Sequence, residues 1–120
     1  MKITRIVTAE NGESHFVDDH LELTDGGEIG RLSALIAGDG VIFRETGADY
    51  DFDWHNAPQR QFVVLLNGAI EIETGDGAQR RFQGGDVLLV EDVSGRGHRT
   101  RNVGETPRRS LFLPVHGPLP

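Results

Sequence analysis

The stretch GADYDFDWHNAPQRQFVVLLNG, residues 47–68, decides the fold of this chain. It holds two short runs rich in aromatic and β-branched residues, 50–55 and 61–66, and no helical spacing of apolar residues. The run 61–66 is apolar on both faces, which predicts a strand buried on both sides. Asn67-Gly68 follows it and is typical of a type I′ hairpin. The stretch therefore predicts β-structure.

Similar strand-like runs continue in both directions from this stretch. We expect further strands at 3–7, 16–23, 32–37, 41–44, 69–74, 78–82, 87–91, 98–102 and 110–115. Turn residues separate them, and Gly38-Asp39-Gly40 predicts a hairpin between 32–37 and 41–44. Glycine supplies 16 of the 120 residues. This spacing predicts one all-β domain over 1–120, a single antiparallel barrel or sandwich with almost no helix.

Composition and charge exclude several classes of function. The chain has no cysteine, so thiol chemistry, disulfides and zinc fingers are excluded. The net charge of −7 disfavours nucleic acid as a partner. No dinucleotide fingerprint or phosphate loop occurs, so no nucleotide cofactor is expected. The longest apolar run, 62–66, is too short for a membrane span, and the first ten residues lack a signal-peptide core. We expect a cytoplasmic protein that binds no membrane.

Strand alternation assigns faces within residues 50–55. One face is expected to hold Asp51, Asp53 and His55, and the other Tyr50, Phe52 and Trp54. The aromatic face and the second apolar face of 61–66 would leave an apolar patch exposed on a monomer. The sequence therefore predicts a homodimer.

The segment 47–68, together with GDVLLVEDVSGRGHRTRN at 85–102, resembles the two motifs of the cupin superfamily, whose small members are single jelly-roll β-barrels. In the first motif, His55 stands at the first histidine position and Gln61 at the glutamate position. Ala57 stands where a second histidine is usual. In the second motif, His98 and Asn102 are in register, while Glu91 replaces a proline and the loop 92–97 is longer than the pattern.

The resemblance implies a divalent metal in the barrel, here held by His55, Gln61 and His98. Two imidazoles and one oxygen donor suit Fe, Mn, Ni or Zn with open positions for a substrate. Asp53 could add a fourth ligand or support His55. The substrate would be a small, possibly anionic organic molecule, and the reaction an isomerisation, a lyase reaction or a dioxygenation. The expected substrate-binding residues are Arg44, Arg60, Arg99 and Asn102.

Two alternatives stay open at this point. One is a metal-free acid–base enzyme similar to the epimerase cupins, with His55 or His98 as the base and Asp53 assisting. The other is a barrel that binds a metabolite without catalysis.

Overall fold

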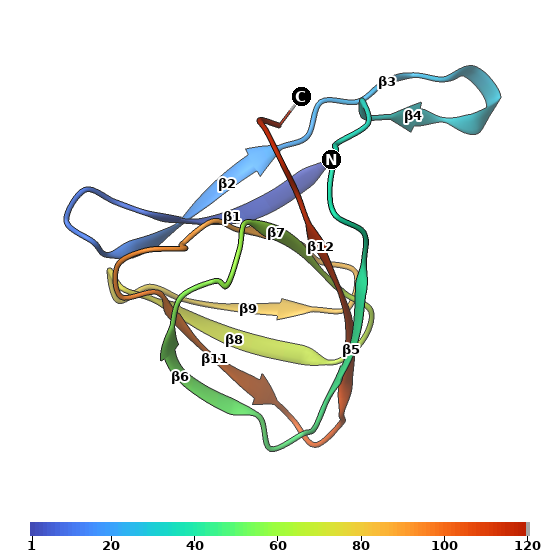
Figure 1. Ribbon diagram of the computed structural model, residues 1–120. Coiled ribbons are helices and arrows are strands. Elements are labelled where there is room, and N and C mark those ends of the chain that lie inside the picture. The colour runs from blue at the N-terminus through green and yellow to red at the C-terminus, as the bar shows by residue number, and fades with distance from the viewer. Residues whose placement is uncertain (120) are drawn as a thin grey trace.

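Eight strands, β5 to β12, contribute four strands to each of two facing sheets in the computed structural model, which describes residues 1–119 (Figure 1). One sheet runs β10-β7-β12-β5 and the other β6-β11-β8-β9. This order is that of a double-sheet jelly roll. The bounds are β5 Ile42–Thr46, β6 Asp51–His55, β7 Gln61–Leu65, β8 Ala69–Thr74, β9 Gln79–Gln83, β10 Val87–Val90, β11 His98–Val103 and β12 Arg108–Pro114.

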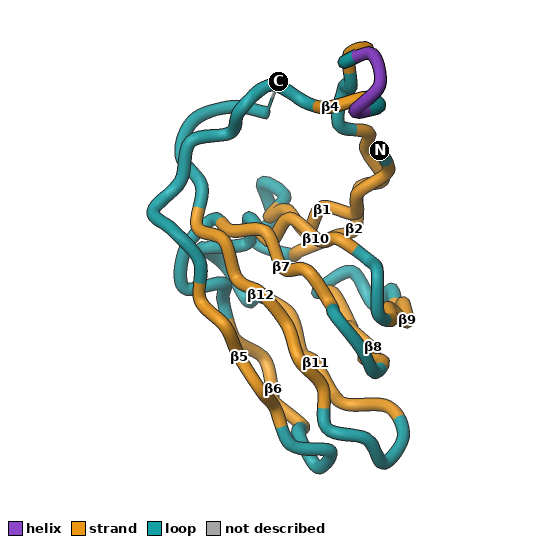
Figure 2. Tube along the Cα trace, turned by 90° about the vertical axis from the view of Figure 1, so that its right-hand side faces the viewer, coloured by secondary structure: helices purple, strands orange, loops and turns teal. Residues whose placement is uncertain are grey.

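An N-terminal hairpin extends the first sheet to six strands. Its strands are β1 (Lys2–Thr8) and β2 (Ser14–His20), and Figure 2 follows this sheet from β5 through β12, β7 and β10 to β1 and β2. β1 joins β10 in parallel, the one parallel pairing among the described strands. A separate pair, β3 (Thr24–Asp25) and β4 (Arg31–Leu32), encloses a 3₁₀ turn and projects from the rest in Figure 1. The predicted all-β fold with almost no helix is confirmed.

The predicted hairpin at Gly38-Asp39-Gly40 is wrong. Residues 32–37 and 41–44 do not pair with each other; β5 pairs with β12, and Gly38 bridges to Val115. A Cβ on Gly38 would lie 2.2 Å from the carbonyl oxygen of Pro114. The glycine therefore permits a close approach to the end of β12, which the sequence pattern cannot distinguish from a turn.

The predicted type I′ hairpin at Asn67-Gly68 is also wrong. β7 and β8 lie in different sheets, so the turn between them crosses from one sheet to the other. A type I′ turn needs positive φ at both central residues, and here only Gly68 has it, at +71°. Asn67 instead uses its Oδ1 to accept a hydrogen bond from the backbone N–H of Arg109 at 2.5 Å.

The core has two layers, one on each side of β7. The residues enclosed between the sheets include Ile6, Val63, Leu65, Ile70, Ile72, Phe82, Leu88 and Val90. On the opposite face, Phe62 and Leu89 pack with side chains from the chain's own segments, among them Leu21, Ile36 and Val115. The prediction that 61–66 is buried on both sides is confirmed for β7. Because the chain itself covers the second face, that face gives no reason for a dimer, and the homodimer stays a prediction.

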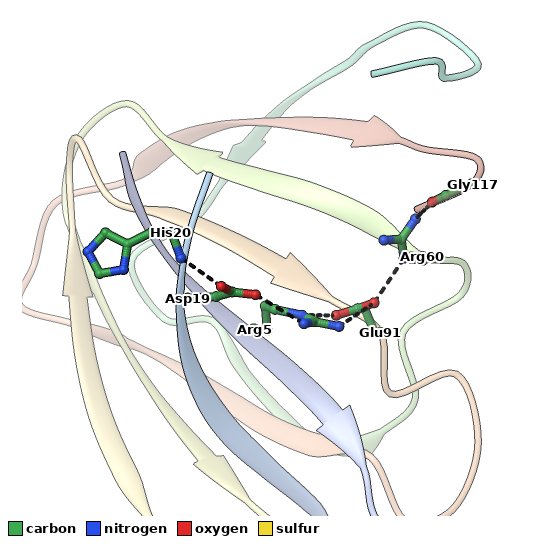
Figure 3. A network of polar contacts seen from close by, with 6 residues as sticks. All are labelled: Arg5, Asp19, His20, Arg60, Glu91 and Gly117. Atoms are coloured by element: carbon green, nitrogen blue, oxygen red, sulfur yellow. Dashed lines mark hydrogen bonds and ion pairs between the residues drawn. The ribbon is translucent and has the colours of Figure 1, made fainter. Parts of the chain in front are cut away.

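An ion-pair network joins this second face to the end of the chain (Figure 3). Glu91 accepts hydrogen bonds from Arg5 Nε at 2.6 Å and from Arg60 Nε at 2.9 Å. Arg5 also reaches Asp19, and Arg60 donates to the carbonyl oxygen of Gly117. Burial raises the pKa of Glu91, but the two arginines outweigh burial, so the pKa lies below its ordinary value.

Candidate functional site

A cavity of about 450 Å³ lies between the two sheets. Much of its wall is apolar, formed by Val63, Ile70, Ile72, Leu88, Val90 and Phe112. Its polar side chains include His55, Gln61, His98, Thr100, Arg44 and Arg108. Phe52 and Ile42 also line it and are about half exposed, 47% and 51%, so they form its rim. A pocket of this size, apolar with a few converging polar groups, is typical of a small-molecule site.

Two histidines lie side by side in the cavity wall. His55 of β6 pairs directly with His98 of β11, and their ring centroids are 4.6 Å apart. His55 Nδ1 lies 2.8 Å from the carbonyl oxygen of Asp53, and His98 Nδ1 lies 2.5 Å from Asp92 Oδ2. An oxygen acceptor beside Nδ1 holds the ring proton there in the neutral imidazole. Nε2 of each ring then carries a free lone pair, with which it could bind a metal ion or accept a hydrogen bond.

A β-bulge sets the surroundings of His55. β6 pairs with β11 at His55↔His98 and Phe52↔Thr100, so two residues on β6 oppose one on β11. The bulge breaks the two-residue alternation and turns Phe52 to the same face as His55, with ring centroids 4.1 Å apart. The predicted faces are therefore wrong for Tyr50 and Phe52, which both line the cavity. Trp54 lies under the guanidinium of Arg96, 3.9 Å from its ring centroid.

Gly97 allows β6 and β11 to meet at the histidine pair. Its φ is +80°, and a Cβ there would lie 2.0 Å from the carbonyl oxygen of His55. The loop before His98 is also held by Ser14, whose hydroxyl donates to the carbonyl oxygen of Gly97 at 2.7 Å. Asp92 is fully buried, and its carbonyl oxygen accepts a hydrogen bond from Ala57 N–H at 3.1 Å. Hydrogen bonds between segments far apart in the sequence thus hold the backbone around both histidines.

The structure brings some of the predicted site residues together in the cavity and places others outside it. Gln61 is 3% exposed and lines the cavity with His55 and His98. Asp53 is exposed, and its carboxylate accepts a hydrogen bond from the N–H of Trp54 at 2.8 Å. Its carbonyl oxygen, not its carboxylate, contacts His55. Asp53 therefore supports His55 through its backbone and not through its carboxylate, and its role as a fourth metal ligand stays a prediction.

Of the predicted substrate-binding residues, only Arg44 lines the cavity. Arg60 lies in the ion-pair network with Glu91. Arg99 lines a groove with Glu71 and Glu73 on the four-stranded sheet β6-β11-β8-β9, which is called the small sheet below. Asn102 is buried and donates to the carbonyl oxygens of the following turn, each at 3.4 Å. For these three, the predicted contact with a substrate in this cavity is not supported.

Two residues of the site, Arg108 and Asp92, are not among the site residues predicted from the sequence. Arg108 begins β12, lines the cavity and is 3% exposed. Its signal was the alternation Arg108, Ser110, Phe112, which shares the inward face with an aromatic residue. Asp92 lies in the loop that departs from the second motif, where no spacing rule placed a partner for His98.

Burial lowers the pKa of two groups in the cavity. Burial lowers the pKa of His55. The hydrogen bond that its ring makes to the carbonyl oxygen of Asp53 opposes this effect, and the nearby His98 lowers the pKa further, so that it lies below the ordinary value. His55 is therefore neutral at pH 7. Burial also lowers the pKa of Arg108, and the neighbouring Arg44 lowers it further. Arginine remains a cation after such a shift.

The donors present fit a metal site of two histidines and one amide. Among residues 1–119 no group of three His, Cys, Asp or Glu side chains could hold an ion, so a metal site that includes His55 and His98 would need Gln61 as its third donor. Each histidine has the oxygen acceptor behind Nδ1 that metal-bound histidines usually have. The buried Gln61 side chain lines the same cavity, so its amide oxygen is the candidate for the third metal ligand.

No family model matches the sequence, and no curated protein matches it either. Among solved structures, protein NMB1881 from Neisseria meningitidis is similar over 68% of this chain and 79% of its own, with TM-score 0.50 and 18% identity. BH2720 from Bacillus halodurans matches over 66% of this chain, with TM-score 0.48 and 20% identity, and this chain spans 64% of its length. The cupin domain of Cnp3 from Schizosaccharomyces pombe matches over 93% of this chain and 85% of its own, with TM-score 0.47 and 16% identity.

Identities of this size concern the fold alone. The match to NMB1881 shows a similar chain fold over about two thirds of this chain, and the order of β5 to β12 is that of a jelly roll. Within residues 1–119, no helix has the length and apolar character that a membrane crossing requires. The order of the strands in the two sheets shows that the chain has the all-β jelly-roll fold that the sequence predicts.

Proposed function

We propose that this chain binds one divalent transition metal in the cavity through His55, His98 and Gln61, and acts there on a small organic molecule. The observation that carries the proposal is the arrangement of the two imidazoles. Their ring centroids are 4.6 Å apart, and Nδ1 of each ring faces an oxygen acceptor, which leaves both Nε2 atoms as donors. Neutral His55 needs no deprotonation before it binds a metal at pH 7.

The residues around the donors have separable roles in this proposal. Asp92 orients His98 through the contact of its carboxylate with Nδ1. The carbonyl oxygen of Asp53 orients His55 in the same way. The apolar wall excludes water from the substrate and strengthens electrostatic contacts within the cavity. A bound divalent ion would supply Lewis acidity toward an oxygen atom of the substrate.

The test is a calorimetric titration of Mn²⁺, Ni²⁺ and Zn²⁺ into untagged protein stripped with a chelator. We expect one site per chain in the wild type. His98→Ala should abolish binding, whereas Gln61→Glu should strengthen it by adding a negative charge to the donor set. His116→Ala is the matched control, since His116 is exposed and pairs with Asp39. Equal affinity in wild type and His98→Ala, with both folded by circular dichroism, would contradict the proposal.

A second candidate function is metal-free acid–base catalysis. It is favoured by the buried pair of His98 and Asp92, at 2.5 Å, beside a neutral second imidazole. The same titration separates the two candidates, because wild-type protein that takes up none of the three ions would support the metal-free function.

A further inference from the structure

We propose that Arg44 and Arg108 form a binding site for the carboxylate group of an organic ligand that has an apolar body. This inference deepens the proposed function, since it assumes that the cavity is the ligand site, and it names the class of molecule bound there. It does not depend on whether a metal is present.

Arg108 is a buried cation with no counterion among residues 1–119. It is 3% exposed, and its Nε is buried without a hydrogen-bond partner. No carboxylate of residues 1–119 forms an ion pair with Arg108 or with Arg44. Buried charges in proteins are normally paired. An arginine kept in a cavity wall with an unfilled donor therefore indicates a missing anion.

The neighbours of Arg108 make a polar patch on one face of two strands. Arg108 lies directly opposite Thr46, and Ser110 lies directly opposite Arg44, so these four side chains occupy alternate positions of β12 and β5. The hydroxyl oxygens of Thr46 and Ser110 are also buried without partners. Thr46 and Ser110 are not among the residues that line the cavity, so a carboxylate bound there would accept hydrogen bonds from Arg44 and Arg108.

Aromatic rings hold the two guanidinium groups near each other. Arg108 lies 5.1 Å and Arg44 5.4 Å from the ring centroid of Tyr50, and Arg44 lies 5.1 Å from that of Phe112. These contacts offset part of the repulsion between the two cations. A planar carboxylate can then take parallel N–H donors from a guanidinium that is already positioned.

The rest of the cavity selects for an organic body on the anion. Most of the wall beyond the arginines is aliphatic or aromatic, and the cavity of about 450 Å³ is far larger than an inorganic anion needs. Phosphate alone would leave this wall in contact with water. The ligand class is therefore an apolar or aromatic carboxylate whose opposite end reaches toward His55 and His98.

The test is an NMR titration of ¹⁵N-labelled protein from which a chelator has removed any metal. Benzoate is the probe, and benzamide is its neutral control. We expect benzoate to shift the Nε–H resonance of Arg108 and benzamide to leave it unchanged. Arg108→Met should weaken benzoate binding by about 10- to 100-fold, the loss expected for a charged hydrogen-bonded contact. Arg108→Lys, which keeps the charge but not the planar fork, should weaken it less.

The matched control is Arg99→Met, an arginine on the small sheet outside the cavity, which should bind benzoate as the wild type does. Equal binding of benzamide and benzoate would overturn the proposal, as would wild-type affinity in a folded Arg108→Met protein. Phosphate binding at least as tight as benzoate binding would overturn the assignment to organic carboxylates. Because the chelator removes metal, loss of metal binding by itself leaves these outcomes unchanged, so the two proposals fail separately.

Discussion

Replacing Arg108 by methionine should stabilise the ligand-free protein. Arg108 is 3% exposed, has no ion pair among the described residues and has an unpartnered Nε. Methionine keeps most of the aliphatic stem that packs in the wall, so the substitution removes chiefly the buried charge. A residue retained for ligand binding at the expense of stability should show this behaviour.

The magnitude follows from two opposing contributions. A buried ion costs several kcal/mol even after relaxation and water penetration. The contact with Tyr50, 5.1 Å from the guanidinium to the ring centroid, returns about 0.5–2 kcal/mol. The repulsion from Arg44 adds to the cost. We expect Arg108→Met to raise the free energy of unfolding by about 1–3 kcal/mol.

Urea unfolding in a buffer without organic anions measures this difference. The m-value should be unchanged, so that the midpoint alone reports stability. Arg99→Met, the control outside the cavity, should stay within about 0.5 kcal/mol of the wild type. A loss of 1 kcal/mol or more in Arg108→Met, with Arg99→Met neutral, would show that Arg108 supports the fold and would refute the reasoning.

Three further outcomes are expected. Glu91→Gln should lower the free energy of unfolding at pH 7 by about 1–3 kcal/mol. The pKa of Glu91 in the folded protein lies below its ordinary value of 4.5. The extra stability of the wild type is therefore present above pH 4.5 and is lost as the pH falls through the folded pKa. Acid titrations followed by circular dichroism should therefore converge for the two proteins at low pH, and a constant difference would contradict this. Gly97→Ala should destabilise the protein by more than about 1 kcal/mol and weaken metal binding, because the added Cβ would overlap the carbonyl oxygen of His55. Gly104→Ala is the control: Gly104 also has a positive φ, +86°, but open space around it, so this variant measures the cost of the backbone conformation alone. Asp92→Asn should weaken metal binding about 10- to 100-fold in calorimetry while the protein stays folded, and unchanged affinity would exclude its role behind His98.

Much of the fold was predictable because local patterns determine it. The alternating runs and glycine turns predicted an all-β chain, and the two apolar faces of 61–66 correctly predicted burial on both sides. The errors came from long-range contacts. Gly38 allows a close approach to the backbone of Pro114, and Gly68 lies in a turn between the two sheets. In the sequence, both glycines look the same as glycines of a hairpin turn.

The candidate site was predictable where motif spacing applied and not elsewhere. His55, Gln61 and His98 line one cavity, and the motif positions alone predicted that they would meet. The bulge between β6 and β11 could not be predicted, so Phe52 and Tyr50 were assigned to the wrong face. Arg108 lies 53 residues from His55 in the sequence, and only the packing of β12 in the sheet facing β6 brings both to the cavity. No short pattern encodes such a pairing.

The most direct measurement of the central claim is a crystal structure of the protein soaked in Mn²⁺, with data collected to locate manganese by anomalous scattering. The account predicts one strong peak per chain inside the cavity, bounded by His55, His98 and Gln61, and no such peak in His98→Ala crystals treated identically. A cavity without a peak in the wild type, or a peak that persists in His98→Ala, would contradict it.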